Sequence, residues 1–347
     1  MMLPASTRGD DPTVRLLVAQ YLQVVEAHNV SIPPGYVLLK PDVQDYIYQH
    51  MFNETNIWPL PPTGYRIRIL KMLLAKMEES MSDPDEDEIS DDLMGYLGSL
   101  LSVPHESPLE QAQKLSYVSY TVPGRLGHEV GASVITWENR GLILSSGTTG
   151  FRTWEAALHL ATYLATPKGK SLIQGMDVIE LGSGTGLLSL YCLKYLGANS
   201  VMATDRDPAL LSNIQDCVVQ NNLDPARIKT GIWEWGNPFS QDGDSSGKSI
   251  QSFDVALGAD LIYDVDLVPL LIPTLQDLFD NYKIKHFVIS ATLRNPKTFS
   301  AFFEACGESN LNAHELEFES PPRESQDGLF HSTDVPIRTY IISPSRL

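Results

Sequence analysis

A glycine-rich turn near the middle of the chain has the residue types of a cofactor site. Residues 177–186 read DVIELGSGTG, an apolar run that ends in a turn with three glycines. Such a turn adopts backbone angles that other residues disfavour, and the lack of a Cβ lets a ligand approach the main chain of Gly182, Ser183 and Gly184. We therefore expect a cofactor to bind at this turn.

The glycine spacing and a neighbouring acid indicate which cofactor binds. A dinucleotide site has the pattern G-x-G-x-x-G, whereas this turn reads G-x-G-x-G. Glu180, near the end of the apolar run, would repel a pyrophosphate but could accept hydrogen bonds from a cationic amino-acid group. S-adenosylmethionine carries an ammonium and a sulfonium and no phosphate, so it fits this site better than NAD does.

Two later residues could bind the rest of this cofactor. Asp205 ends the apolar run VMATD, where a carboxylate would accept hydrogen bonds from both hydroxyls of a ribose. The alternative is that Asp205 caps the next helix, but Asp207, directly before Pro208, suits that role better. Trp235 could cover an adenine ring with its flat apolar face, although a position in the core remains open for it.

The segment Asp-Leu-Ile-Tyr at residues 260–263 follows a fourth apolar run and should face the group that is transferred. Carboxyl ends of parallel strands meet at one edge of a sheet, so Asp260 and Tyr263 should lie beside the methyl group of the cofactor. An alternative is that Asp260 caps the next helix. Methyl transfer from a sulfonium is an in-line displacement that needs an oriented neutral amine and no metal. If the acceptor is an amine, we expect both residues to position it, with the Tyr263 ring facing the developing methylammonium and solvent removing the proton.

An alternation of helices and strands after residue 153 must position these residues. The expected helices cover residues 154–165, 186–196, 208–222, 267–279 and 297–306, and the expected strands cover residues 177–181, 200–204, 227–232, 253–259, 285–290, 313–318 and 337–342. Such an alternation builds a parallel sheet with helices on both faces. The last two strands are joined by a long connection and suggest an antiparallel pair at one edge. We predict an α/β fold with a doubly wound sheet of seven strands.

The first third of the chain is expected to be mainly helical. Apolar periodicity predicts helices over residues 14–29, 42–51 and 64–77, and the acidic block SDPDEDEISDD at residues 82–92 predicts a loop. Strand-forming residues between 117 and 145 predict a hairpin with its turn at residues 138–141. The predicted organisation is a helical domain over 1–116, a β-hairpin connection over 117–146 and a cofactor-binding domain over 147–347.

Charge and composition disfavour several classes of partner. The net charge of -18 repels phosphate, so no nucleic acid is expected to be required, and a basic partner suits the field better. The alternative is that the acidic residues only keep the chain soluble. Cys192, Cys217 and Cys306 lack the spacing of a zinc site or of a disulfide framework. No apolar run has the length of a signal peptide or a membrane span. These features predict a soluble, cytoplasmic protein that is a monomer and has no membrane partner.

The motifs together resemble the seven-strand, or class I, methyltransferases, which have a Rossmann-like sheet, and among them the protein-lysine methyltransferases. That branch carries an Asp-x-x-Tyr motif, here Asp260 to Tyr263, and a Trp-x-x-Ala segment, here Trp154 to Ala157. Residues 147–157 and the helical extension before them are similar to the methyltransferases that modify a lysine of eukaryotic translation elongation factor 2. The resemblance implies cofactor contacts by Trp154 and Ala259 in addition to those above, and elongation factor 2 as the protein substrate.

Other functions fit parts of the same pattern. A methyltransferase of a small amine or of nucleic acid would share the cofactor site, but the negative charge disfavours nucleic acid and the long N-terminal extension favours a macromolecule. A non-catalytic interaction protein could use the fold as a scaffold, although the intact glycine turn, Asp205 and Asp260 argue against it. A nicotinamide-dependent oxidoreductase is disfavoured by Glu180 and the glycine spacing. The sequence thus favours an S-adenosylmethionine-dependent protein-lysine N-methyltransferase.

Overall fold

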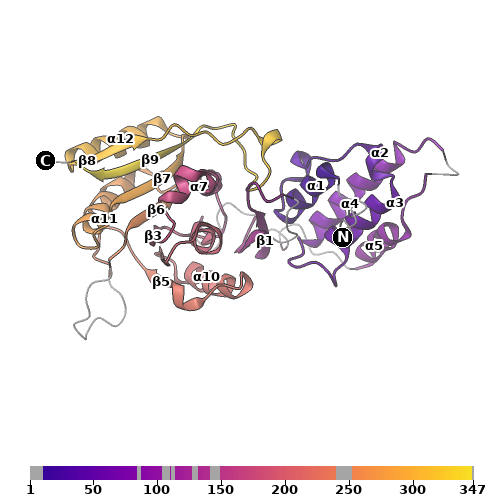
Figure 1. The fold of residues 1–347 in the computed structure, drawn as a ribbon, viewed down its shortest axis with the longest axis horizontal. Helices are drawn as coiled ribbons and strands as arrows, with labels where there is room; N and C mark the ends of the chain where they lie inside the picture. The colour runs from indigo at the N-terminus through magenta and orange to yellow at the C-terminus, as the bar shows by residue number, and fades with distance from the viewer. Residues whose placement is uncertain are drawn as a thin grey trace, which may run out of the picture. The chain divides into compact units, whose positions relative to one another are not determined.

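The computed structural model divides the chain into two compact units. It describes residues 11–83, 87–103, 110, 114–126, 132–140, 149–239 and 252–345. The N-terminal unit comprises Met1–Ser133 and Asn139–Leu142, and the C-terminal unit comprises Val134–Glu138 and Ile143–Leu347. In Figure 1 the first is a group of indigo and purple helices and the second is a sheet with helices, coloured from magenta to yellow. No helix of the described residues is long and apolar enough to cross a membrane.

Helices form most of the N-terminal unit. Their bounds are α1 (Pro12–Leu22), α2 (Gly35–Leu38), α3 (Pro41–Ile47), α4 (Thr63–Glu78) and α5 (Asp91–Ser102), with a 3-10 turn at Ala27–Asn29 and a π turn at Tyr48–Phe52. Their apolar faces share one core, in which Tyr21, Phe52 and Ile69 are fully buried. The helices predicted over residues 42–51 and 64–77 are present, whereas α2 and α5 add to the prediction.

The helix predicted over residues 14–29 is wrong in its length, because α1 ends at Leu22. Val24 has a left-handed φ of 55°. The amides of Val24 and Val25 donate to the carbonyl oxygens of Tyr21 and Gln20, each at 3.0 Å, which is the Schellman arrangement of a helix end. Glycine usually takes the left-handed position, and a β-branched residue is strained there, so the sequence does not indicate this helix end.

The acidic segment is a loop for most of its predicted length. Residues 84–86 lie outside the described part of the chain. The Asp87 carboxylate accepts hydrogen bonds from the amides of Ser82 and Asp83 at 2.7 and 3.0 Å. The Ser90 hydroxyl caps α5 by accepting from the amide of Asp92 at 3.3 Å. The predicted loop over 82–92 is therefore two residues too long, because its last two acids form the first turn of a helix, where negative charge is favourable.

The strand over residues 133–138 pairs with an earlier strand that was not predicted as its partner. β1 (Ser116–Thr121) and β2 (Ser133–Glu138) form a two-stranded sheet. The partner of β2 thus precedes it, a pairing that alternation along one strand does not specify. The predicted hairpin with a turn at 138–141 stays a prediction, because residue 141 is not among the described residues. The expected strand residues 142–144 lie outside the described residues. Most of β2 belongs to the C-terminal unit, where the main chain of Ile135 exchanges two hydrogen bonds with the Asn221 side chain at 2.9 and 2.7 Å.

A seven-stranded sheet forms the centre of the C-terminal unit. Its strands are β3 (Asp177–Leu181), β4 (Ser200–Asp205), β5 (Ile228–Ile232), β6 (Val255–Ala259), β7 (His286–Thr292), β8 (Leu311–Glu315) and β9 (Ile337–Pro344). Their order is β5-β4-β3-β6-β7-β9-β8, and only β9 runs antiparallel to its neighbours β7 and β8. The predicted α/β sheet of seven strands with an antiparallel pair at one edge is confirmed.

Helices pack against this sheet close to the predicted positions. They are α7 (Glu155–Ala165), α8 (Pro167–Ser171), α9 (Leu187–Tyr191) with a π turn at Cys192–Leu196, α10 (Pro208–Gln220), α11 (Val268–Asp280) and α12 (Pro296–Glu308). Helix α7 contacts β6, β7 and α9, and helices α11 and α12 contact each other in a core that contains β6 and β7 side chains. The short helix α8 adds to the prediction.

The strand order determines where a ligand site can form. The chain runs outward from β3 through β4 to β5 and then returns to β6, on the other side of β3. Ligands bind outside the carboxyl ends of the strands at such a reversal. Gly182, Asp205 and Asp260 each end one of these strands or directly follow it, so the topology brings them to the same edge.

Candidate active site

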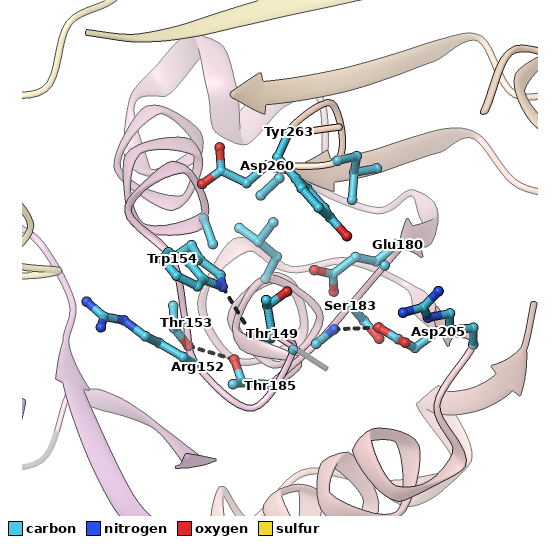
Figure 2. Close-up of a pocket in the computed structure, with 18 of the residues that line it drawn as sticks. Thr149, Arg152, Thr153, Trp154, Glu180, Ser183, Thr185, Asp205, Asp260 and Tyr263 are labelled. Carbon is cyan, nitrogen blue, oxygen red and sulfur yellow. Dashed lines mark hydrogen bonds between the residues drawn. The ribbon is translucent and has the colours of Figure 1, made fainter. Parts of the chain in front are cut away.

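One cavity of about 480 Å³ lies at the carboxyl ends of β3, β4 and β6 (Figure 2). Its volume is in the range of small-molecule sites, roughly 300–1,000 Å³. The cavity is lined by every candidate site residue of the sequence analysis: Trp154, Glu180, Gly182, Ser183, Gly184, Asp205, Trp235, Ala259, Asp260 and Tyr263. The structure thus brings the candidate cofactor residues and the candidate acceptor residues together.

The glycine turn forms the floor of this cavity and has no room for side chains. Gly182 and Gly184 have left-handed φ angles of 59° and 50°. A Cβ on Gly182 would lie 2.8 Å from Cδ2 of Leu261, and one on Gly184 would lie 3.1 Å from the carbonyl oxygen of Gly150. Both angle and space therefore require glycine here, and the main chain stays open to a ligand.

Glu180 lines the cavity and also holds the helix that follows the turn. Its buried carboxyl group accepts hydrogen bonds from the amide of Ser189, at 2.9 Å, and from the Ser189 hydroxyl. Burial raises the pKa of Glu180 to about 8, against the opposing effect of the two bonds from Ser189. The side chain thus joins the end of β3 to α9, besides facing the ligand space.

Asp205 ties the end of β4 to the glycine turn. Its Oδ2 accepts from the amide of Gly184 at 3.0 Å, as Figure 2 shows, and its Oδ1 accepts from the amide of Asp207 at 3.1 Å. A carboxylate can accept about four hydrogen bonds, and the amide of Arg206 also contributes to Asp205, so acceptor capacity remains for a ligand hydroxyl. Asp207 caps α10 by accepting from the amide of Ala209 at 2.9 Å, so Asp205 is not the cap.

The two tryptophans after β5 have different environments. Trp233 is a core residue, because its ring stacks on Phe239 at 4.7 Å between centroids and its Nε1 donates to the carbonyl oxygen of Asn237. Trp235 is only partly buried, and its ring edge lies 3.4 Å from the Cβ position of Gly182. Trp235 is thus the tryptophan whose ring lies beside the glycine turn.

Asp260 leaves β6 in a left-handed conformation, with a φ of 51°, and its carboxylate turns toward the end of β7. It accepts hydrogen bonds from the amide and the hydroxyl of Thr292 at 2.8 and 3.2 Å, and its Oδ2 lies 3.5 Å from Nη1 of Arg294. Burial raises the pKa of Asp260, while Thr292 and Arg294 oppose that rise. The next helical turn is capped by Asp264, which accepts from the amide of Asp266, so the alternative of Asp260 as a helix cap is wrong.

Tyr263 follows Asp260 on the same loop and is the most exposed aromatic side chain of the cavity, at 56%. Figure 2 shows its ring projecting into the cavity beside Asp260, above Glu180. An amine that enters between the two residues would meet a carboxylate and the face or hydroxyl of a phenol.

Trp154 precedes α7 and lies between two guanidinium groups that the sequence analysis did not single out. Its Nε1 donates to the carbonyl oxygen of Thr149 at 3.1 Å, as Figure 2 shows. The Cζ atoms of Arg152 and Arg294 lie 5.0 and 5.2 Å from its ring centroid, within range of a cation–π interaction. Arg294 comes two residues after β7, so the rule that sites form at carboxyl ends of strands could have found it.

A buried hydrogen-bond chain connects β2 to the glycine turn. Glu138 is fully buried, and its Oε1 accepts from the hydroxyls of Thr136 and Thr153 at 2.5 and 2.7 Å. The hydroxyls of Thr153 and Thr185 lie 2.6 Å apart. Because Thr153 already donates its proton to Glu138, the Thr185 hydroxyl must donate to Thr153, which leaves its lone pairs for the cavity. No local sequence pattern indicates this chain.

Comparison with known proteins identifies the family to which this chain belongs. Residues 142–309 match the family described as "Lysine methyltransferase". Over 319 residues the chain is 37% identical to Protein-lysine N-methyltransferase EFM3 of Chaetomium thermophilum. The aligned region covers 92% of this chain and 94% of that protein. The chain belongs to the lysine methyltransferase family. It is therefore a protein-lysine N-methyltransferase that takes its methyl group from S-adenosylmethionine, as the sequence predicted.

Two further members of this family are more distant relatives. Protein-lysine N-methyltransferase EFM3 of Saccharomyces cerevisiae is 29% identical over 307 residues, 79% of this chain and 84% of that protein. Human Protein-lysine N-methyltransferase EEF2KMT is 24% identical over 281 residues, 77% of this chain and 76% of that protein. Both similarities extend well beyond the matched family segment, so they include part of the N-terminal unit.

The chemistry of the lysine methyltransferase cavity fits its cofactor. Three carboxyl groups, those of Glu180, Asp205 and Asp260, line it, and their oxygens can accept hydrogen bonds from the ammonium and hydroxyl groups of such a ligand. The guanidinium groups of Arg152 and Arg294 also line it, but their side chains stay 28% and 44% exposed at its rim. The glycine turn leaves the main chain accessible where added Cβ atoms would collide.

Proposed function

We propose that this lysine methyltransferase modifies a lysine of translation elongation factor 2. The observation that carries the acceptor chemistry is that Asp260 and Tyr263 line the same cavity as the glycine turn. The choice of elongation factor 2 is supported by the resemblance of residues 147–157 and of the helical extension, and by the similarity to human EEF2KMT. Residues 147 and 148 lie outside the described residues, so only 149–157 are placed at the cavity.

In this proposal, residues at the carboxyl ends of β3 to β6 would hold the cofactor. The main chain of Gly182, Ser183 and Gly184 and the Glu180 carboxyl group would bind its amino-acid portion, and Asp205 would accept hydrogen bonds from its ribose. Trp235 would cover its adenine, and Trp154 and Ala259 would complete the walls. When bound, S-adenosylmethionine supplies a methyl group on a sulfonium, which is open to attack by an amine.

The residues after β6 would position the lysine amine for an in-line displacement. Asp260 accepts a hydrogen bond from the amine nitrogen and so turns its lone pair toward the methyl carbon. Tyr263 presents its aromatic face to the cationic methylammonium product. Attack needs a free lone pair, so the lysine ammonium would first give up one proton to solvent, and the neutral amine would then accept the methyl group as its bond to the sulfonium breaks.

The domain organisation and the cellular setting belong to the same proposal. Residues 147–347 form the catalytic domain, residues 117–146 connect it, and the helical residues 1–116 recognise the protein substrate. Cys192, Cys217 and Cys306 are buried free thiols, which supports a reducing compartment and a cytoplasmic location. We propose that the enzyme acts as a monomer.

Labelling of a natural extract tests the substrate. The enzyme is incubated with radiolabelled S-adenosylmethionine and a lysate of cells that lack it, and also with elongation factor 2 purified from those cells. We expect one labelled protein band that comigrates with elongation factor 2 and disappears with the Asp260→Ala variant. A different labelled band would contradict the proposed substrate, and label confined to RNA would contradict a protein substrate altogether.

A further inference from the structure

Among the described residues, Arg294 is the cationic side chain that forms an ion pair with the Asp260 carboxylate. Its Nη1 lies 3.5 Å from Oδ2 of Asp260, and its Nη2 lies 3.3 Å from Oε2 of Glu155, the first residue of α7. Its guanidinium also covers the Trp154 ring at 5.2 Å. One side chain from the loop after β7 therefore touches both a candidate catalytic residue and a candidate cofactor residue.

Arg152 provides a close comparison within the same cavity. Its Cζ lies 5.0 Å from the Trp154 centroid, and its Nη2 lies 3.7 Å from Oε1 of Glu155. Arg152 and Arg294 thus share two partners, the ring and the carboxylate of Glu155. The contact with Asp260 belongs to Arg294, since no ion pair between Arg152 and Asp260 occurs in the described structure.

We propose that Arg294 is a positioning residue for methyl transfer, which holds the Asp260 carboxylate in its charged form and in a fixed orientation. The inference rests on the proposed role of Asp260. Thr292 binds both oxygens of the carboxylate from one side, and Arg294 fixes Oδ2 from another, so the direction of the remaining lone pairs is set. A carboxylate in this state can accept a hydrogen bond from an entering amine.

The charges around Asp260 make this role necessary. Burial disfavours the ionised carboxylate and raises its pKa, and the nearby Glu155 carboxylate on α7 acts in the same direction. Thr292 and Arg294, both at the end of β7, lower it. Tyr263, on the same loop as Asp260, is the other titratable group at this end of the cavity. Loss of Arg294 would leave the two carboxylates facing each other, and Asp260 would take up a proton more readily.

A titration that needs no substrate tests the inference. The side-chain carboxyl carbons of aspartate are labelled with ¹³C in the full chain, and the Asp260 signal is assigned by its loss in Asp260→Asn. Arg294→Met should move the titration of Asp260 to higher pH, while Arg152→Met, which removes the matching contacts with Trp154 and Glu155, should leave it unchanged. Arg294→Gln should show the same shift as Arg294→Met, and it is the second test variant if the Met variant does not fold.

Steady-state kinetics of the same variants provide a second test. Arg294→Met should lower kcat/KM about threefold in the alkaline range, as expected for a partly exposed ion pair, and the loss should deepen as the pH falls. The acid limb of the Arg152→Met profile should stay at the wild-type position. Identical titrations of Asp260 in wild type, Arg294→Met and Arg294→Gln would overturn the inference. The NMR result stands apart from the substrate proposal, because it is obtained without elongation factor 2.

Discussion

The wall of the cavity formed by β3 and β4 is held by main-chain hydrogen bonds, whereas the wall formed by β6 and β7 is held by charged side chains. On the first wall, Asp205 accepts from the amides of Gly184 and Asp207, and the turn itself is shaped by glycine backbone angles. On the second wall, Asp260 is held by Thr292 and by an ion pair with Arg294. Salt should therefore weaken the ion pair of the second wall more than the hydrogen bonds to main-chain amides on the first wall.

Removal of the Asp260 carboxylate should have the largest effect and should separate the two walls most clearly. We expect Asp260→Ala to lower kcat about a thousandfold, because the amine loses its orienting partner, while the dissociation constant of S-adenosylmethionine changes by less than about threefold. Asp205→Ala should show the reverse, with weaker cofactor binding as the main effect. Calorimetry and steady-state kinetics measure the two quantities. If Asp260→Ala and Tyr263→Phe both leave turnover intact, the second wall is not the acceptor site.

A side chain on the glycine turn should damage the first wall by steric strain. Gly182→Val forces a β-branched residue to a φ of 59° and pushes its Cβ toward Leu261. We expect cofactor binding to weaken about a hundredfold, since such strain costs about 1–3 kcal/mol before the collision is counted. The matched control is Gly307→Ala on α12, where an added Cβ meets nothing within 4 Å. Tight binding by Gly182→Val would show that the cofactor does not approach this turn.

Disruption of the hydrogen bonds that connect Glu138, Thr153 and Thr185 should weaken the positioning of the glycine turn. Glu138→Gln replaces one acceptor oxygen by an NH₂ group, so one of the donors from Thr136 and Thr153 loses its partner. We expect cofactor affinity to fall about fivefold and the free energy of unfolding to fall by about 1–3 kcal/mol, the cost of a buried unsatisfied group.

The control variant for these hydrogen bonds is Thr136→Val. It removes one donor to Glu138 and leaves the hydrogen bond between Thr153 and Thr185 intact. Its cofactor affinity should stay at the wild-type value, as measured by calorimetry beside chemical denaturation. Equal losses of affinity in Glu138→Gln and Thr136→Val would mean that the chain stabilises the fold without orienting Thr185.

The smallest predicted effect is a dependence of stability on pH that comes from Glu180. Burial raises its pKa to about 8 in the folded protein, so between pH about 4.5 and about 8 the unfolded chain is ionised here and the folded protein is protonated. Unfolding then releases a proton, and this contribution to stability is lost as the pH rises. Glu180→Gln cannot titrate, so its Tm relative to wild type should rise steadily between about pH 5 and about pH 8. A constant difference across this range, in thermal unfolding followed by circular dichroism, would contradict the assignment.

The sheet and the glycine turn could be predicted because their signals are local. Strands of the parallel sheet are continuous apolar runs. The turn is indicated by three glycines within five residues, Gly182 to Gly186. Asp205, Trp235 and Asp260 followed from one topological rule, that parallel strands end at the same edge. The same rule applied to β7 would have predicted Arg294.

The remaining contacts depend on pairings that the sequence does not encode locally. Glu138 is fifteen residues before Thr153, and no sequence pattern links the two. The pairing of β2 with β1 was missed, because alternation predicts a strand without its partner. The end of α1 was missed because Val24 occupies a position that usually takes glycine, so its apolar side chain continued the helical pattern.

The position of Glu138 has a practical consequence for anyone who shortens this protein. The segment shared with the lysine methyltransferase family begins at residue 142, after the strand that carries this carboxylate. A fragment trimmed to that boundary would keep the glycine turn and Asp205 but would lose both the acceptor for Thr153 and the main-chain partner of Asn221. The smallest part of the chain that can be expected to retain the cofactor therefore has to include β2.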